Sequence, residues 1–163
     1  MILIALGANM PSHHGAPPET LAAAVNALAC QNIHIVKASR IWLTAPVPTS
    51  DQPWYHNQVV QVETGQAPFA LLETLQRIEN DFGRAKTVRN APRVLDLDLI
   101  AYHDEILDGP ELIVPHPLLR QRAFVLLPLR EIAPDWIHPV TRQPLSALIA
   151  ALPDGQEAKP LTN

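Results

Sequence analysis

The order of strand-like and helix-like segments constrains the fold of this chain more than any other feature of its sequence. Residues 2–7 form a short apolar run typical of a buried strand, and helical spacing follows from Pro17. Residues 34–44 alternate in the manner of one strand, and residues 57–63 predict the next. The first half of the chain is therefore expected to run strand, helix, strand, strand.

The second half adds another helix and another strand. Helical spacing begins at Pro68 and ends at Gly83, and residues 94–102 are almost entirely apolar, which predicts a central strand. The complete order, βαββαβ, is that of a ferredoxin-like sheet. The sequence thus predicts an α+β fold.

A shorter extension follows this core. Asp108-Gly109 predicts a hairpin, and helical patterns at 123–132 and 145–152 predict a mostly helical C-terminal extension. The chain has 163 residues, of which 47% are hydrophobic, enough to surround one core. We therefore expect a single domain spanning residues 1–163.

Composition narrows the range of partners. The net charge of −4 gives no long-range attraction for nucleic acid. No apolar run approaches the ~18 residues that a membrane span requires, and the first residues lack the basic region of a signal peptide. The single cysteine, Cys30, cannot form a disulfide within the chain, which fits a reducing compartment. These features predict a cytoplasmic protein that binds neither nucleic acid nor membrane.

Two carboxylates interrupt the apolar strand at 94–102. Asp96 and Asp98 are two residues apart, so in a strand they leave from the same face with Cα atoms about 7 Å apart. Two like charges held together call for a cation, and oxygen ligands suit Mg²⁺. A pair of ions about 3.5–4 Å apart would also fit. The alternative is that these acids pair with nearby arginines at the edge of the sheet.

Positive charge is concentrated in two places. One is a ten-residue stretch without acids that holds Arg84, Lys86, Arg89 and Arg93; the other holds Arg120 and Arg122. Because neither a P-loop nor a Rossmann glycine motif is present, side chains would have to bind a phosphate, and His116 can add a donor. The alternatives are a solvated surface for the cations and a helix-capping turn for the histidine.

A flat ligand is suggested by a few aromatic side chains outside the core pattern. Trp54 and Tyr55 follow a proline-rich loop and precede Asn57, so they can offer a ring wall beside an amide. Phe124 can form an opposite wall. Core packing is the alternative reading for these residues.

Taken in order along the chain, these motifs resemble the 6-hydroxymethyl-7,8-dihydropterin pyrophosphokinase family. The resemblance covers nearly the whole chain. It rests on Leu6-Gly7-Ala8-Asn9, Asp51-Gln52-Pro53-x-Tyr55-x-Asn57, Gln76-x-x-Glu79, Gly83-Arg84, Pro92-Arg93-x-Leu95-Asp96-Leu97-Asp98, Val114-Pro115-His116, Arg122-x-Phe124 and Glu131-Ile132-Ala133-Pro134.

The resemblance implies a ferredoxin-like monomer that transfers pyrophosphate from ATP to the hydroxymethyl group of the pterin and releases AMP. It implies that Asp96 and Asp98 ligate two Mg²⁺ ions and that Arg84 and Lys86 lie on a loop that closes over the phosphates. The implied pterin contacts are Thr44, Val47, Tyr55, Asn57 and Phe124. The implied ATP contacts are Gln76, Glu79, Arg93, Leu99, His116 and Arg122.

Several positions depart from the family pattern. Lys86 stands where arginine is usual, and it keeps the charge but lacks the bidentate guanidinium. Asn90 replaces a common tryptophan, Pro117 a common tyrosine and Ala8 a common serine, and the basic loop is one residue shorter. Two alternatives therefore stand beside the enzyme: a relative with impaired turnover, and a non-catalytic metabolite-binding module on the same fold.

Overall fold

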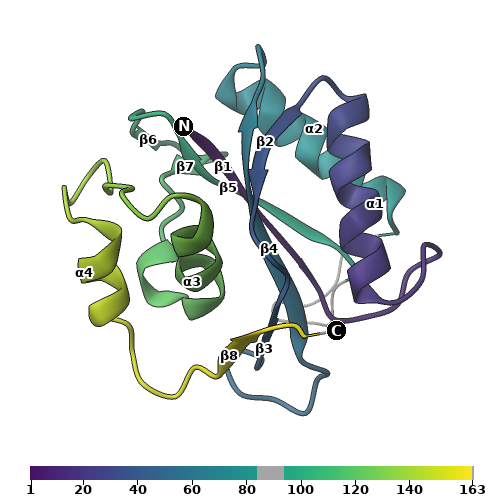
Figure 1. Cartoon of the computed structure of the whole chain (residues 1–163). Coiled ribbons are helices and arrows are strands. Elements are labelled where there is room, and N and C mark those ends of the chain that lie inside the picture. Colours follow the sequence, from purple (N-terminus) through teal and green to yellow (C-terminus); the bar gives the residue numbers. More distant parts are fainter. Residues whose placement is uncertain (84–93, 163) are drawn as a thin grey trace.

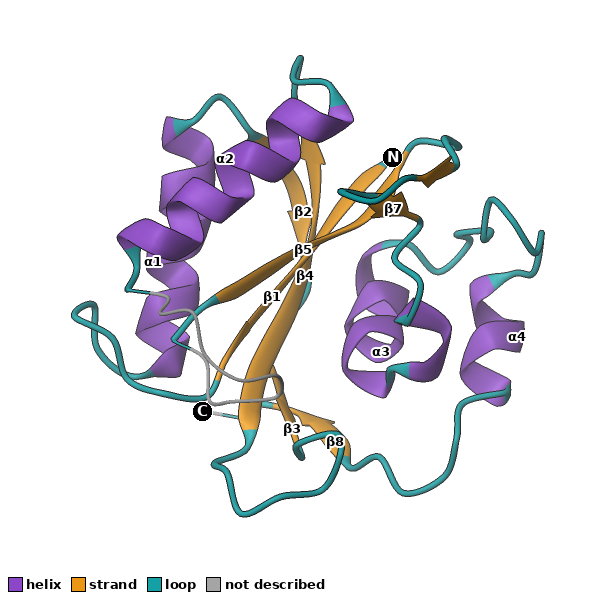
Figure 2. Cartoon of the chain, turned by 180° about the vertical axis from the view of Figure 1, so that it is seen from behind, coloured by secondary structure: helices purple, strands orange, loops and turns teal. Residues whose placement is uncertain are grey.

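A six-stranded antiparallel sheet separates two helical layers in the computed structural model, which describes residues 1–83 and 94–162. Helices α1 and α2 cover one face of the sheet, and α3 covers the other, with α4 packed on the outer side of α3 (Figure 1; the reverse view is Figure 2). The helices are α1 (Pro17–Cys30), α2 (Pro68–Asp81), α3 (Ala123–Ile132) and α4 (Leu145–Ala150), with a 3₁₀ turn, η1, at Leu119–Gln121. The strands are β1 (Ile2–Ala8), β2 (His34–Ala38), β3 (Trp42–Thr44), β4 (Tyr55–Glu63), β5 (Asp96–Tyr102), β6 (Leu107–Asp108), β7 (Ile113–Val114) and β8 (Ala158–Pro160).

The order of the strands confirms the predicted ferredoxin-like core. The main sheet runs β5-β1-β4-β3-β8, with β2 also paired to β4. Counting β2 and β3 together as the second strand, this is the fourth, first, third and second strand of a βαββαβ unit, with α1 and α2 as its two helices. The strand β8 is an addition to that core.

The single strand expected at 34–44 is divided in two, and Ser39 explains the division. Its Oγ accepts the Val59 N–H at 3.0 Å and donates to the Arg40 carbonyl at 2.7 Å, and its N–H donates to the Val59 carbonyl at 2.9 Å. The register between β2 and β4 also shifts between Ile35 and Lys37. A serine whose hydroxyl replaces a ladder acceptor interrupts the strand, and side-chain alternation alone does not reveal this.

The prediction that residues 94–102 form a central strand was wrong about its place. The strand β5 lies at the end of the sheet, paired with β1. It is apolar because both of its faces are covered: Leu97 and Leu99 belong to the core under α1 and α2, and Ile100 and Ala101 to the core under α3 and α4. Burial on both faces produces the apolar pattern of a central strand without a neighbour on both sides.

The C-terminal extension contains the expected hairpin and helices and one unexpected strand. The strands β6 and β7 pair around Gly109, and α3 and α4 follow. The last strand, β8, pairs with β3 and joins the tail to the sheet. Its three residues, Ala-Lys-Pro, carry no strand pattern of their own. Among the described residues, no helix has both the length and the apolar character needed to cross a membrane.

His138 gives the fold a pH dependence. Its Nδ1 accepts the backbone N–H groups of Val140 and Thr141, both at 3.2 Å, so the buried ring is held in its neutral form. Burial, and then the charge of Arg120, lower the pKa of His138 from its ordinary 6.5. Because the unfolded chain binds the proton more readily, the free energy of unfolding is fully retained above pH 6.5 and decreases as the pH falls below it.

We expect His138→Asn, which retains an acceptor near Nδ1 but does not titrate, to lose less stability than the wild type between pH 7 and pH 5. Urea unfolding at each pH measures this. The control His34→Asn removes an exposed histidine from β2. An identical loss of stability in the wild type and His138→Asn would contradict the assignment.

Candidate active site

The two aspartates of β5 lie on one face of the sheet, as predicted. Asp96 is opposite Gly7 and Asp98 is opposite Ala5 of β1. Leu97, between them, is buried on the α1 and α2 side, so both carboxylates are directed toward the α3 side. Both are half-buried and line the same cavity. The chain therefore holds two acids side by side at an accessible site.

This cavity has a volume of about 250 Å³ and is formed by segments from across the chain. Strands β1 and β5 supply its floor, the loop after β3 and the start of β4 supply one side, and the start of α3 supplies another. Its lining residues are Ala5, Leu6, Gly7, Thr44, Ala45, Pro46, Val47, Pro48, Ser50, Gln52, Tyr55, Asn57, Asp96, Asp98, Arg122 and Phe124. All five predicted pterin contacts and both predicted metal ligands are among them.

Asn57 presents a fixed amide at the floor of the cavity. It is 7% exposed, and its Nδ2 donates to the Thr44 Oγ1 at 2.6 Å. Gly7 is its partner in β1, and a Cβ built on Gly7 would lie 2.6 Å from the Asn57 Oδ1. Only glycine leaves space for the amide here, which gives the motif Leu6-Gly7 a physical reason.

Tyr55 and Phe124 bring aromatic surface to the same cavity from different elements. Tyr55 begins β4 opposite Thr44, and Phe124 lies in the first turn of α3. The Arg122 guanidinium carbon lies 5.3 Å from the centre of the Phe124 ring, within cation–π distance. Trp54 is not among the lining residues, so the ring wall suggested for Trp54 and Tyr55 together is provided by Tyr55.

The loop from 45 to 53 is fastened to the end of β1 by Asn9. Its Nδ2 donates to the Gln52 Oε1 and to the Pro53 carbonyl, both at 3.1 Å. Gln52 itself lines the cavity. The sequence places both residues in motifs without indicating a role for them; its available signal is an asparagine directly after an apolar run, and the structure shows that this asparagine is buried.

Glu131, near the end of α3, binds two side chains at and just before β3. Its carboxylate accepts hydrogen bonds from Trp42 Nε1 at 2.8 Å and from Arg40 Nε at 2.6 Å. Burial alone would raise the pKa of the Glu131 carboxyl, but the Trp42 and Arg40 hydrogen bonds and the Arg40 charge outweigh it and lower the pKa. Since Trp42 is the β3 partner of Asn57, this contact joins α3 to the strand beside the cavity.

His116 lies near the cavity but does not line it. Its Nδ1 accepts the Leu118 N–H at 3.2 Å, so it is a turn histidine, but it does not cap η1, which begins after Leu118 and has no side-chain cap. Burial, and then the Arg122 charge, lower the pKa of His116 from 6.5 to about 4, although Asp96 opposes the shift. At neutral pH the ring is therefore neutral and carries its proton on Nε2.

Three of the residues expected to bind ATP lie on the α2 side of β5. Glu79 is buried, and its Oε2 accepts the Leu97 N–H at 2.8 Å, which satisfies a backbone donor of this outer strand. The Leu99 side chain is in the core, and Gln76 is exposed on α2 beside a shallow depression. The structure does not bring these side chains into the main cavity. Arg84, Lys86 and Arg93 lie outside the described residues.

The donor set suits magnesium. Within the part of the chain that the structure describes, no group of three or more His, Cys, Asp or Glu side chains is arranged to hold a metal. Asp96 and Asp98 can supply two carboxylate ligands, and Mg²⁺ is characteristically bound by one or two carboxylates together with substrate phosphates and water. A metal would therefore be completed here by a ligand that brings its own oxygen atoms.

Comparisons with known proteins identify the family of this chain. The family model described as 7,8-dihydro-6-hydroxymethylpterin-pyrophosphokinase (HPPK) matches residues 3–134. The 2-amino-4-hydroxy-6-hydroxymethyldihydropteridine pyrophosphokinase of Haemophilus influenzae is 42% identical over 137 residues, covering 83% of this chain and 83% of that protein. The protein of the same name from Pseudomonas aeruginosa is 38% identical over 161 residues, covering 98% of this chain and 96% of its own length.

Longer proteins match as well. The folic acid synthesis protein of Schizosaccharomyces pombe is 39% identical over 76% of this chain, but the chain spans only 17% of its length. A crystal structure of Plasmodium falciparum HPPK-DHPS with pteroate shares the fold, with a TM-score of 0.68 at 14% identity, over 91% of this chain and 41% of that one. The family model and the two bacterial relatives establish that the chain belongs to the 7,8-dihydro-6-hydroxymethylpterin-pyrophosphokinase family.

Proposed function

We propose that this protein transfers the pyrophosphoryl group of ATP to the hydroxymethyl oxygen of 6-hydroxymethyl-7,8-dihydropterin, a step of folate biosynthesis. One observation carries the proposal. The cavity that presents Asp96 and Asp98 is also the cavity lined by Tyr55, Asn57 and Phe124. A ring-shaped acceptor and a metal-bound phosphate donor can therefore meet in one site.

The ring end of the cavity suits a pterin. Tyr55 and Phe124 offer apolar surface for stacking, and the amide of Asn57, held by Thr44, offers a fixed hydrogen-bonding edge. Val47 lies beside them on the loop after β3. A heteroaromatic ring with several donors and acceptors matches this combination better than a purely apolar ligand does.

The phosphate end of the cavity carries the charges that the transfer requires. We propose that Asp96 and Asp98 hold two Mg²⁺ ions, which would neutralise charge on the triphosphate. Arg122 would bind phosphate oxygens through its guanidinium, and His116, neutral and protonated on Nε2, would donate a further hydrogen bond. Arg84, Lys86 and Arg93 are proposed to complete the cationic side.

The reaction forms one P–O bond and breaks another. The hydroxymethyl oxygen attacks the β-phosphorus of ATP and releases its proton to solvent, the bond from that phosphorus to the α–β bridging oxygen breaks, and AMP leaves with the bridging oxygen. The contribution of the chain is to align the alcohol with the phosphorus and to balance negative charge, which is the main requirement of phosphoryl transfer.

For the rest of the nucleotide we propose the contacts implied by the family, Gln76, Glu79 and Leu99. Leu99 lies on the outer strand β5, so its backbone, rather than its buried side chain, would make the contact. Glu79 would act partly by fixing the backbone of β5, because its carboxylate accepts the N–H of Leu97, which lies between the two aspartates.

AMP release tests the proposal directly. We expect AMP to form from ATP only when 6-hydroxymethyl-7,8-dihydropterin and Mg²⁺ are both present, and we expect EDTA to stop it. Chromatography of the nucleotides measures this. A folded protein that binds the pterin by calorimetry without nucleotide or Mg²⁺, and forms no AMP, would instead be a metabolite-binding module.

A further inference from the structure

Residues 156–160, here called the tail, contact both walls of the cavity: the start of α3, which carries Phe124, and the strand β3 with the loop after it. The Gln156 side chain forms two hydrogen bonds with the backbone at the start of α3. Its Oε1 accepts the Ala123 N–H at 2.9 Å, and its Nε2 donates to the Gln121 carbonyl at 2.7 Å. These two backbone groups flank Arg122, and Phe124 follows directly. The amide of Gln156 thus fixes the backbone that carries two of the residues lining the cavity.

The next residues of the tail bind the other wall, at the end of β3 and the start of the loop that follows it. The carbonyl of Glu157 accepts the Ala45 N–H at 3.0 Å, and Ala158 pairs with Thr44 in the sheet. Thr44 is the residue that orients the Asn57 amide. Five consecutive residues, 156–160, therefore join the wall formed by α3 to the wall formed by β3.

The start of α3 and the loop that follows β3 have few contacts within their own elements. The helix α3 has no side-chain N-cap, because Arg122 occupies the cap position and its side chain lies at the cavity. An N–H in the first turn of a helix needs an acceptor from elsewhere, and Gln156 supplies it to Ala123. On the other side, the loop between β3 and β4 has no regular structure along residues 45–54.

We propose that Gln156 is a positioning residue for the pterin: by bridging the start of α3 to the β3–β8 pair, it sets the separation of the two ring-binding walls. This inference rests on the proposed function. It assigns the tail a larger role in ring affinity than in phosphate binding, since the aspartates are carried by β5, which the tail does not pair with, and Arg122 is the one proposed phosphate contact on the backbone that Gln156 holds.

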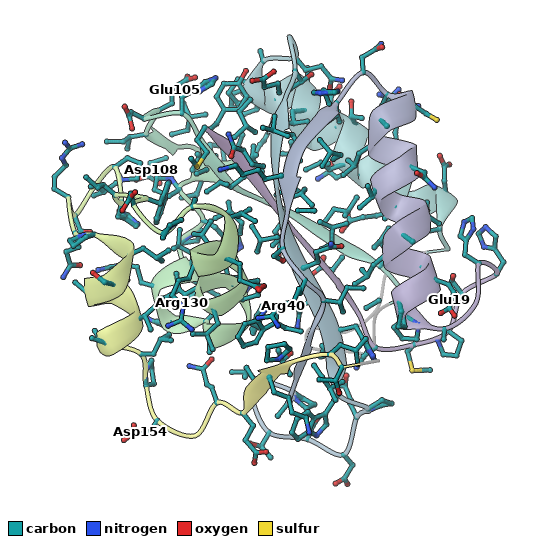
Figure 3. All side chains as sticks on the ribbon, in the orientation of Figure 1. Glu19, Arg40, Glu105, Asp108, Arg130 and Asp154 are labelled. Atoms are coloured by element: carbon teal, nitrogen blue, oxygen red, sulfur yellow. The ribbon has the colours of Figure 1, made fainter. Side chains whose placement is uncertain are left out.

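Two substitutions at one position separate the two hydrogen bonds. Gln156→Ala removes both, and we expect the KM for the pterin to rise about tenfold, with kcat within about twofold of wild type and a smaller rise in the KM for ATP, through Arg122. Gln156→Glu keeps an acceptor for Ala123 but places a second carboxylate oxygen against the Gln121 carbonyl, so its effect should be at least as large. Asp154→Ala is the matched control, since Asp154 points into solvent two residues earlier (Figure 3), and its kinetics should match the wild type.

Two further measurements do not depend on turnover. Amide hydrogen exchange at Ala123 should be faster in Gln156→Ala than in the wild type or Asp154→Ala. Calorimetry with the pterin and α,β-methylene ATP should show weaker pterin binding in the same variant. An unchanged pterin KM and affinity, or an equal loss for both substrates together with a lowered melting temperature, would overturn the inference. Absence of AMP formation in the wild type would instead refute the proposed function, and the exchange and pterin-affinity data would still decide the role of Gln156.

Discussion

Asp98→Ala is expected to reduce AMP formation by at least about a thousandfold, which corresponds to about 4 kcal/mol of transition-state stabilisation. Asp98 lies beside Asp96 on the cavity face of β5, so its removal leaves one carboxylate to hold the proposed Mg²⁺ ions. The fold should persist, because the side chain is half-exposed and the cores on both faces of the sheet are formed by other residues. Single-turnover assays with excess enzyme, and circular dichroism, measure the two effects.

The control for this change is Asp108→Ala. Asp108 is an exposed aspartate on the β6–β7 hairpin (Figure 3), and it is not among the residues that line the cavity. Its loss removes the same charge from the protein and should leave turnover within about twofold, as for surface substitutions in general. If Asp98→Ala retained more than a tenth of the wild-type rate at saturating Mg²⁺, the metal role of the pair would be refuted.

Gly7→Ala is expected to lower kcat/KM about a hundredfold through loss of pterin affinity. The added methyl carbon would lie 2.6 Å from the Asn57 Oδ1, far inside van der Waals contact. Asn57 cannot turn away without breaking its 2.6 Å hydrogen bond to Thr44, so the amide edge of the cavity must move. Calorimetry with the pterin and α,β-methylene ATP measures the affinity directly.

Gly65→Ala is the matched control for the glycine substitution. A Cβ at Gly65 meets no atom within 4 Å, so the same chemical change adds a methyl group in open space. Its pterin affinity should equal that of the wild type. A Gly7→Ala protein that binds the pterin with wild-type affinity would contradict the proposed hydrogen bonding between the Asn57 amide and the pterin ring.

The core of the fold and the centre of the site could be predicted because both follow from local periodicity. Alternation places Asp96 and Asp98 on one face whatever surrounds them, and the order of the segments dictates the βαββαβ sheet. The position of β5 at the edge of the sheet could not be predicted in the same way. An apolar strand indicates burial on both faces, and the helices provide that as effectively as neighbouring strands would.

What could not be predicted depends on partners distant in sequence. The Ser39 hydroxyl accepts the Val59 N–H and so divides the strand predicted at 34–44. The Glu79 carboxylate, on α2, accepts the Leu97 N–H of β5. The strand β8 has no pattern of its own and exists because β3 offers an open edge. Long-range hydrogen bonds of this kind leave no periodic trace, so only the folded chain reveals them.

The two-residue repeat of β5 also limits how this protein can vary. If one residue were gained or lost between Asp98 and Leu99, with the rest of β5 held in place, the segment before it could keep its pairing with β1 only by turning over or by adding a bulge to the register shift already present between Leu3 and Ile4. Turning over would place both acids in the core that contains Leu71 and Leu75 of α2, and Leu97 would lie at the floor of the cavity. Related chains that retain the activity should therefore differ in length in the connections around this strand rather than by a single residue within positions 96–99.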